Sequence, residues 1–101
     1  MRHVNFSVNQ GLTATSTNTI LNKTINIITT LGTAPYNVAT PTIAVGRQLY
    51  VFNDTASTIN IVPPTGITVD GLTTYPLGSS ARLHLVAGTL TKWYALTAVY
   101  A

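Results

Sequence analysis

Ionisable side chains that could do acid–base chemistry are few in this chain of 101 residues. Its acids are Asp54 and Asp70, its histidines are His3 and His84, and it has no Glu and no Cys. General acid–base catalysis needs titratable groups placed together, while disulfides, thiolate metal sites and cysteine nucleophiles need Cys. The composition leaves almost nothing from which to build a catalytic site, and we expect that the protein is not an enzyme.

A Ser-His-Asp triad can be written on paper from Ser79 or Ser80, His84 and Asp70. Neither serine stands in a motif that resembles the strained turn which presents a catalytic serine. Asp70-Gly71 is instead a strong signal for a hairpin turn, because both positions tolerate a positive φ. We therefore interpret Asp70 as a turn residue, and a hydrolase is the weakest of the functions considered.

Sites for metals, phosphates and cofactors are equally poorly supported. His3 and His84 could share a metal ion, but two ligands without a third make a weak site. The glycines of 66–71 precede no helix and form no phosphate loop, and Asp54 stands in an Asn-Asp-Thr turn. Trp93-Tyr94 could stack on a sugar, although aromatic residues in a last strand more often pack in a core or an interface. We expect neither a metal nor a cofactor.

The elements that would position these side chains are strands, because apolar and polar residues alternate along most of the chain. Proline-containing and glycine-containing turns recur every 8–12 residues or so, as in a β-sandwich or β-barrel. The sequence predicts an all-β fold, a single compact sandwich or barrel of about seven or eight short strands. The predicted strands are 4–8, 20–31, 42–45, 47–52, 58–62, 67–69, 81–86 and 91–99.

The whole chain, 1–101, is expected to form one β domain, since its length allows a single core. Residues 1–19 would contribute a strand and a less regular arm, the polar tract 11–19, and residues 20–101 the main β core. Strand alternation places a set of apolar residues on the inner faces. These predicted core residues are Val51, Ile61, Val69, Leu83, Leu85 and Trp93.

Charge is scarce: charged residues make up 7% of the chain and the net charge is +3. The five cations are scattered rather than clustered, which argues against a nucleic-acid partner. The uncharged stretch 24–46 is broken by Pro35 and Pro41, so it makes a poor spanning helix and we expect no membrane partner. Depletion of charge is typical of the buried centre of protein interfaces. We therefore expect a homo-oligomer, a trimer or a dimer.

Residues 50–96 contain an ordered set of short motifs. They are Val51-Phe52-Asn53-Asp54, Ile59-Asn60-Ile61-Val62-Pro63-Pro64-Thr65-Gly66, Ile67-Thr68-Val69-Asp70-Gly71, Tyr75-Pro76-Leu77-Gly78 and Lys92-Trp93-Tyr94-Ala95. In this order the motifs resemble a small β-module of tailed-bacteriophage virion proteins. The resemblance covers about half of the chain and implies a structural role, with no catalytic residues.

The resemblance implies a capsid decoration (cement) subunit on the exterior of the virion head. Its partner would be the major capsid protein, and it would stabilise the shell by binding across neighbouring subunits. A short chain without repeats or a coiled-coil stalk suits this role better than a fibre tip. The alternative is a head-fibre or tail-fibre adhesin module that binds host-surface glycans.

The residues expected at the interface with the shell come from the arm and from the scattered cations. The arm and the exposed strand edges would supply apolar and backbone contacts, and the arginines would orient docking on an acidic shell. The interface candidates are Arg2, Leu12, Arg47, Arg82 and His84.

Overall fold

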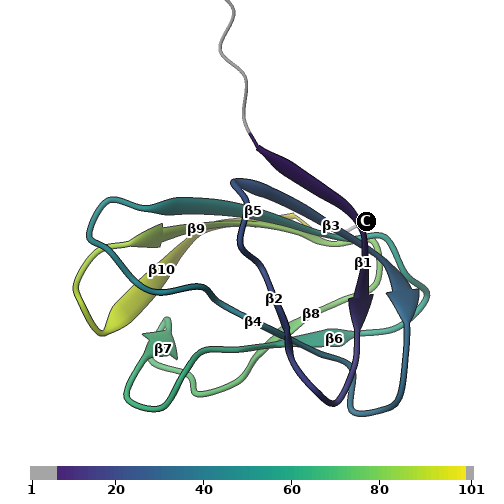
Figure 1. Ribbon diagram of the computed structural model, residues 1–101. Coiled ribbons are helices and arrows are strands. Elements are labelled where there is room, and N and C mark those ends of the chain that lie inside the picture. Colours follow the sequence, from purple (N-terminus) through teal and green to yellow (C-terminus); the bar gives the residue numbers. More distant parts are fainter. Residues whose placement is uncertain (1–6, 100–101) are drawn as a thin grey trace, which may run out of the picture.

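Ten strands in two facing sheets make up the part of the chain that the computed structural model describes, residues 7–99 (Figure 1). The six-stranded sheet has the order β1-β3-β5-β9-β10-β7, and the four-stranded sheet has the order β2-β4-β6-β8. The strands of the first sheet are β1 (Val8–Ala14), β3 (Ile25–Leu31), β5 (Gln48–Asn53), β7 (Thr68–Val69), β9 (Arg82–Ala87) and β10 (Lys92–Val99). Those of the second are β2 (Thr19–Ile20), β4 (Asn37–Ala39), β6 (Ile59–Val62) and β8 (Tyr75–Leu77).

The chain crosses from one sheet to the other after each of its first eight strands. Strands β1, β3 and β5 consequently pair in parallel in one sheet, as β2, β4 and β6 do in the other. The antiparallel strands β8 and β9 then pair with β6 and β5, and β10 pairs with β9. The N-terminal two thirds are thus a flattened parallel coil. The C-terminal part that closes it is antiparallel except where β10 pairs in parallel with β7.

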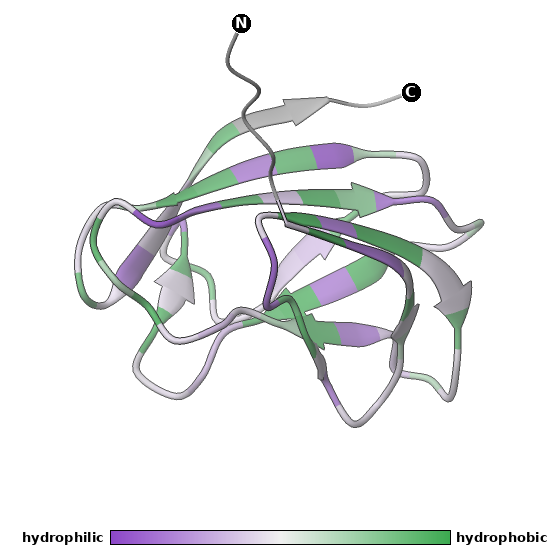
Figure 2. Ribbon diagram, turned by 45° about the horizontal axis from the view of Figure 1, so that its top comes forward, coloured by the Kyte–Doolittle hydropathy of each residue, from purple (hydrophilic) through white to green (hydrophobic). Residues whose placement is uncertain are grey.

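The core lies between the two sheets and is filled from alternate positions of each strand. All six core residues predicted from the sequence are at most 2% exposed, and Trp93 is the largest side chain among them. Figure 2 shows the alternation as bands of apolar and polar colour along the strands. The all-β fold predicted from the sequence is therefore confirmed, as is the assignment of its inner faces.

The predicted arm is wrong for residues 11–14, which belong to β1. This strand pairs with β3, and Ala14 at its end is completely buried. The polar composition of this segment does not favour a strand. The strand forms because its backbone pairs with β3, and this pairing outweighs the weak local propensity. The strand is irregular, however: its register shifts on both sides of Leu12, and Gly11 has a φ of 83°. Of the strand predicted over 4–8, residues 4–6 lie outside the described part of the chain.

The strand predicted over 42–45 is also wrong, because the strand of this region lies before Pro41 rather than after it. It is β4, in which Val38 is buried and pairs with Ile61.

Strand β8 was not predicted, since Pro76 stands in its middle. β8 lies at the edge of its sheet, where a residue without an N–H is tolerated. Within residues 7–99 we find no helix suited to crossing a membrane.

Candidate functional site

The groups of the hypothetical triad form hydrogen bonds with other residues. His84 Nε2 lies 2.9 Å from Gln48 Oε1, and Ser79 Oγ donates to the Thr55 carbonyl at 2.6 Å. Asp70 Oδ1 accepts the backbone N–H of Ala95 at 3.0 Å. Among the described residues, no three His, Cys, Asp or Glu side chains are grouped to hold a metal ion.

Asp70 is a turn residue, as predicted from the Asp-Gly pair. Asp70 and Gly71 have φ values of 51° and 82°, and Val69 and Leu72 exchange both backbone hydrogen bonds across the turn. The carboxylate of Asp70 then ties this turn to β10 at Ala95, beside the bulge of that strand. The sequence predicted the turn but not this second role.

Asn53 is a polar centre of the core that the sequence analysis did not identify. It is 1% exposed, and its Nδ2 lies 2.8–2.9 Å from the carbonyls of Ser57, Leu77 and Gly78. Its Oδ1 accepts both the N–H and the hydroxyl of Thr55. This one side chain therefore joins the end of β5 to the end of β8, and so fixes the two sheets relative to each other.

The outer face of the six-stranded sheet is the broadest candidate surface. Cross-strand register places its side chains in rows, because residues paired across a ladder share a face. One row runs Val8, Ile25, Tyr50 and His84, and the next runs Gln10, Ile27, Phe52 and Arg82. We define the outer face by these eight residues together with Gln48, Val86 and Tyr94, and with the exposed Leu96 in the bulge of β10.

Most residues of the outer face are apolar or aromatic, yet they are half-buried or exposed. Tyr94 is 39% and Leu96 58% exposed. The cations of this region lie over rings: Arg82 Cζ is 5.7 Å from the centroid of Phe52, and Lys92 Nζ is 4.8 Å from that of Tyr94. Such contacts are weakly favourable at a surface and leave the cations partly free to meet a partner.

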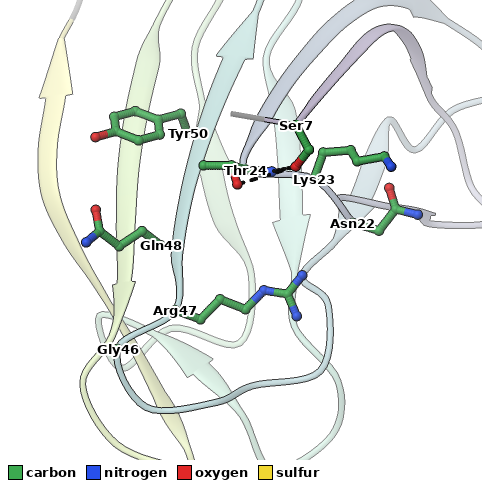
Figure 3. A pocket seen from close by; sticks show the side chains of 8 residues that line it. All are labelled: Ser7, Asn22, Lys23, Thr24, Gly46, Arg47, Gln48 and Tyr50. Carbon is green, nitrogen blue, oxygen red and sulfur yellow. Dashed lines mark hydrogen bonds between the residues drawn. The ribbon is translucent and has the colours of Figure 1, made fainter. Parts of the chain in front are cut away.

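The interface candidates predicted from the sequence separate into three groups. Arg82 and His84 lie together on the outer face, with Tyr50 and Phe52 as their neighbours. Arg47 precedes β5 and lines a hollow of about 460 Å³ at the amino ends of β3 and β5 (Figure 3). Leu12 is half-buried and packs against the core, and Arg2 lies outside the described residues.

The aromatic pair Trp93-Tyr94 is divided between the two faces of the sheet. Trp93 is fully buried and belongs to the core, whereas Tyr94 belongs to the outer face. The interpretation of Trp93 as a core residue is therefore confirmed, and only Tyr94 of this pair is placed to meet a ligand.

Comparison with known proteins adds no relative: no protein-family model matches the chain, and no match was found among the curated proteins.

Proposed function

We propose that the protein is a structural subunit of a tailed-bacteriophage virion, a capsid decoration protein that binds the major capsid protein on the exterior of the head. The outer face carries this proposal, because an apolar and aromatic sheet face with few charges is suited to binding protein. The resemblance of residues 50–96 to a virion module supplies the class of partner.

The chemistry of the outer face suits a lasting contact rather than a steered encounter. Tyr50, Phe52 and Tyr94 are the kind of side chain that anchors interfaces, since each adds a large apolar area at little conformational entropy. A subunit that covered the boundary between two shell proteins with this face would have to be detached before the two could separate. That coupling is how a decoration protein would stabilise the shell.

Strand β1 offers a second surface, because it lies at the edge of the six-stranded sheet and, within residues 7–99, pairs there with β3 alone. An edge strand presents unpaired N–H and C=O groups to which another strand can be added. The other strands at the ends of the two sheets are two or three residues long, and β8 carries a proline. Strand β10 also has an open edge, because within the described residues β7 pairs with it only at Lys92 and Trp93. We propose that a homo-oligomer, a dimer or a trimer, forms at β1. A stable monomer in sedimentation at micromolar concentration would contradict this.

The second candidate function is a fibre adhesin that binds host-surface glycans. It is favoured by Tyr94, whose ring is exposed on the outer face beside Lys92, since sugars stack on exposed aromatic rings. A glycan array distinguishes the two functions. Binding to defined glycans, lost in Tyr94→Ala, would favour the adhesin.

The decoration function is tested by electron microscopy of purified particles that contain this chain. We expect density for the protein on the outside of the head, bridging shell subunits, and we expect Leu96→Glu to weaken that occupancy. Leu90→Glu is the matched control, because Leu90 is 68% exposed but lies in the turn between β9 and β10. Density at a fibre tip, or equal loss of occupancy in both variants, would contradict the proposal.

A further inference from the structure

Two adjoining hollows at the amino ends of β3 and β5 form one groove. The first, of about 460 Å³, includes Lys23 and Arg47 in its lining, and the second, of about 440 Å³, includes Ile20, Pro41 and Pro64. Asn22 and Arg47 line both, so the hollows meet at these two side chains. We call the pair of hollows the end groove. It adjoins the outer face, because Gln48 and Tyr50 of that face also line the first hollow.

The first hollow is cationic and has no acid to balance it. None of its eight lining residues is Asp or Glu. Asp54 follows the opposite end of β5, and Asp70 stands in the turn after β7. Figure 3 shows Arg47, Lys23 and Asn22 extending to the same side of β5, whereas Gln48 and Tyr50 extend to the other.

Arg47 is poised to bind a further acceptor. Its guanidinium has five N–H donors, and Nη1 donates to the carbonyl of Thr42 at 3.3 Å. The remaining donors can take both oxygens of a carboxylate, the geometry in which arginine binds best. Lys23 and the Asn22 amide supply further donors at the same end of the groove.

The second hollow has a different chemistry. Ile20 is 56% exposed, and two prolines complete an apolar wall beside it. An apolar side chain would bury area against this wall, while Arg47, which lines both hollows, would meet the negative charge of the ligand. The groove therefore matches a ligand that carries a negative charge at one end and an apolar group a few ångströms away.

We propose that the end groove binds an extended peptide segment of a partner protein in which a carboxylate at one position is followed or preceded, two positions away, by an apolar side chain. Side chains at i and i+2 of an extended segment lie on the same side, so the two would enter the two hollows together. That the partner is a shell subunit rests on the proposed function, whereas the groove and its ligand chemistry do not.

Other ligands fit less well. A nucleic acid would need a track of cations for successive phosphates, and this groove has two beside an apolar wall. A sugar would need an exposed ring for stacking, but the ring of Tyr50 is stacked on His84.

The test is an amide chemical-shift titration of the full chain with the synthetic peptide acetyl-Leu-Gly-Glu-Gly-Leu-amide, which offers an apolar residue on both sides of the acid. We expect saturable shifts at residues 20–24 and 46–48, with a dissociation constant on the order of 1–10 mM. Replacing the peptide's Glu by Gln, or both Leu by Gly, should weaken binding at least about threefold. Matched protein variants are Arg47→Gln, expected to lose binding, and Arg82→Gln, expected to retain it.

Three outcomes would overturn the proposal: no saturable shift, equal binding of the Glu and Gln peptides, or equal binding by the Arg47→Gln and wild-type proteins. Tighter binding of N-acetylneuraminic acid at the same residues would also overturn it and assign the groove to an acidic sugar. Because the titration uses the isolated chain, its failure would leave particle binding by the outer face untouched. Loss of particle binding would likewise leave the titration unaffected.

Discussion

His84 and Tyr50 stack face to face on the outer face, with ring centroids 4.2 Å apart and planes 10° from parallel. They are direct cross-strand partners of β9 and β5. The hydrogen bond from the imidazole to Gln48 fixes the third side chain of the cluster. The middle of the outer face is thus held in place before any partner arrives, which lowers the entropy that binding must overcome.

The stacked pair should show energetic coupling. In a double-mutant cycle with Tyr50→Val and His84→Val, we expect an interaction free energy of about 0.5–1.5 kcal/mol in urea unfolding. Valine keeps the preference for a strand at both positions. The control cycle combines Tyr50→Val with Tyr94→Val, two residues that are not cross-strand partners, and should be additive. Equal coupling in the two cycles would mean that the stack contributes nothing specific.

Asn53 should be the polar residue whose loss is most destabilising. Asn53→Leu removes a buried amide whose Nδ2 donates to the carbonyls of Ser57, Leu77 and Gly78 and whose Oδ1 accepts from Thr55. The Ser57 and Gly78 carbonyls keep a second donor, the Thr55 hydroxyl and the Ala81 N–H, so the penalty comes mainly from the Leu77 carbonyl and the Thr55 N–H. Because each buried polar group left unsatisfied costs about 1–3 kcal/mol, we expect a loss of about 2–4 kcal/mol in the free energy of unfolding. Asn60→Leu is the control: Asn60 is half-buried and makes one side-chain hydrogen bond, to Asn37 at 3.3 Å, so its loss should stay near 1 kcal/mol. Comparable losses would show that Asn53 does not join the sheets.

The sequence predicted the fold class and the inner faces because strand alternation alone carries that information. Val51, Leu83 and Trp93 are buried for this reason. The sequence could not show that β1 pairs in parallel with β3, since the path of the chain, and not the local pattern of residues, determines which strands pair in parallel. The sequence also has no repeat that would indicate the parallel coil, because its paired strands follow one another at unequal spacings: Val8 pairs with Ile25, and Ile25 with Tyr50.

The candidate surfaces were predictable in part. Arg82 and His84 were two of the interface candidates, and both lie on the outer face. The end groove was not predicted, because Ile20, Lys23 and Arg47 come from loops and strand ends that only the winding of the chain brings together. Asn53 was predicted to be in a turn but is the last residue of β5, and no local pattern shows that its side chain is buried.

The turn after β7 depends on a backbone conformation that alanine adopts poorly. A Cβ at Gly71 would meet no atom within 4 Å, so strain is the only penalty of Gly71→Ala, about 1–2 kcal/mol at its φ of 82°. Gly78 has equally open space around it but no positive φ in the left-handed range. Gly78→Ala should therefore be neutral or stabilising by up to about 1 kcal/mol. Thermal melts that show the same change for both variants would contradict the assignment of the turn.

Burial should separate two leucines of equal size. Leu83 is 2% exposed in the core, and Leu83→Ala should cost about 2–5 kcal/mol. Leu72 is 46% exposed in the turn after β7, so Leu72→Ala should change the free energy of unfolding by about 0.5 kcal/mol or less. An unchanged melting temperature for Leu83→Ala would mean that the inner face of β9 is assigned wrongly.

Salt should act differently on the two proposed binding surfaces. The outer face would bind the shell mainly through apolar contacts around Tyr50 and Phe52. The end groove, in contrast, would bind the carboxylate of its ligand through Arg47.

Raising the salt concentration from about 0.1 M to 1 M shortens the Debye length from about 10 Å to 3 Å, which screens exposed charges and leaves buried apolar contacts intact. We therefore expect peptide binding at the groove to weaken several-fold, while the protein remains on particles that are washed and sedimented in 1 M salt. Arg82 and Lys92 lie over the rings of Phe52 and Tyr94 and stay partly free to meet a partner, but salt that weakens such ion pairs should leave the apolar contacts intact. Release from the particles by 1 M salt alone would show that ion pairs hold the protein there, and the outer face would then not be the surface that binds the shell.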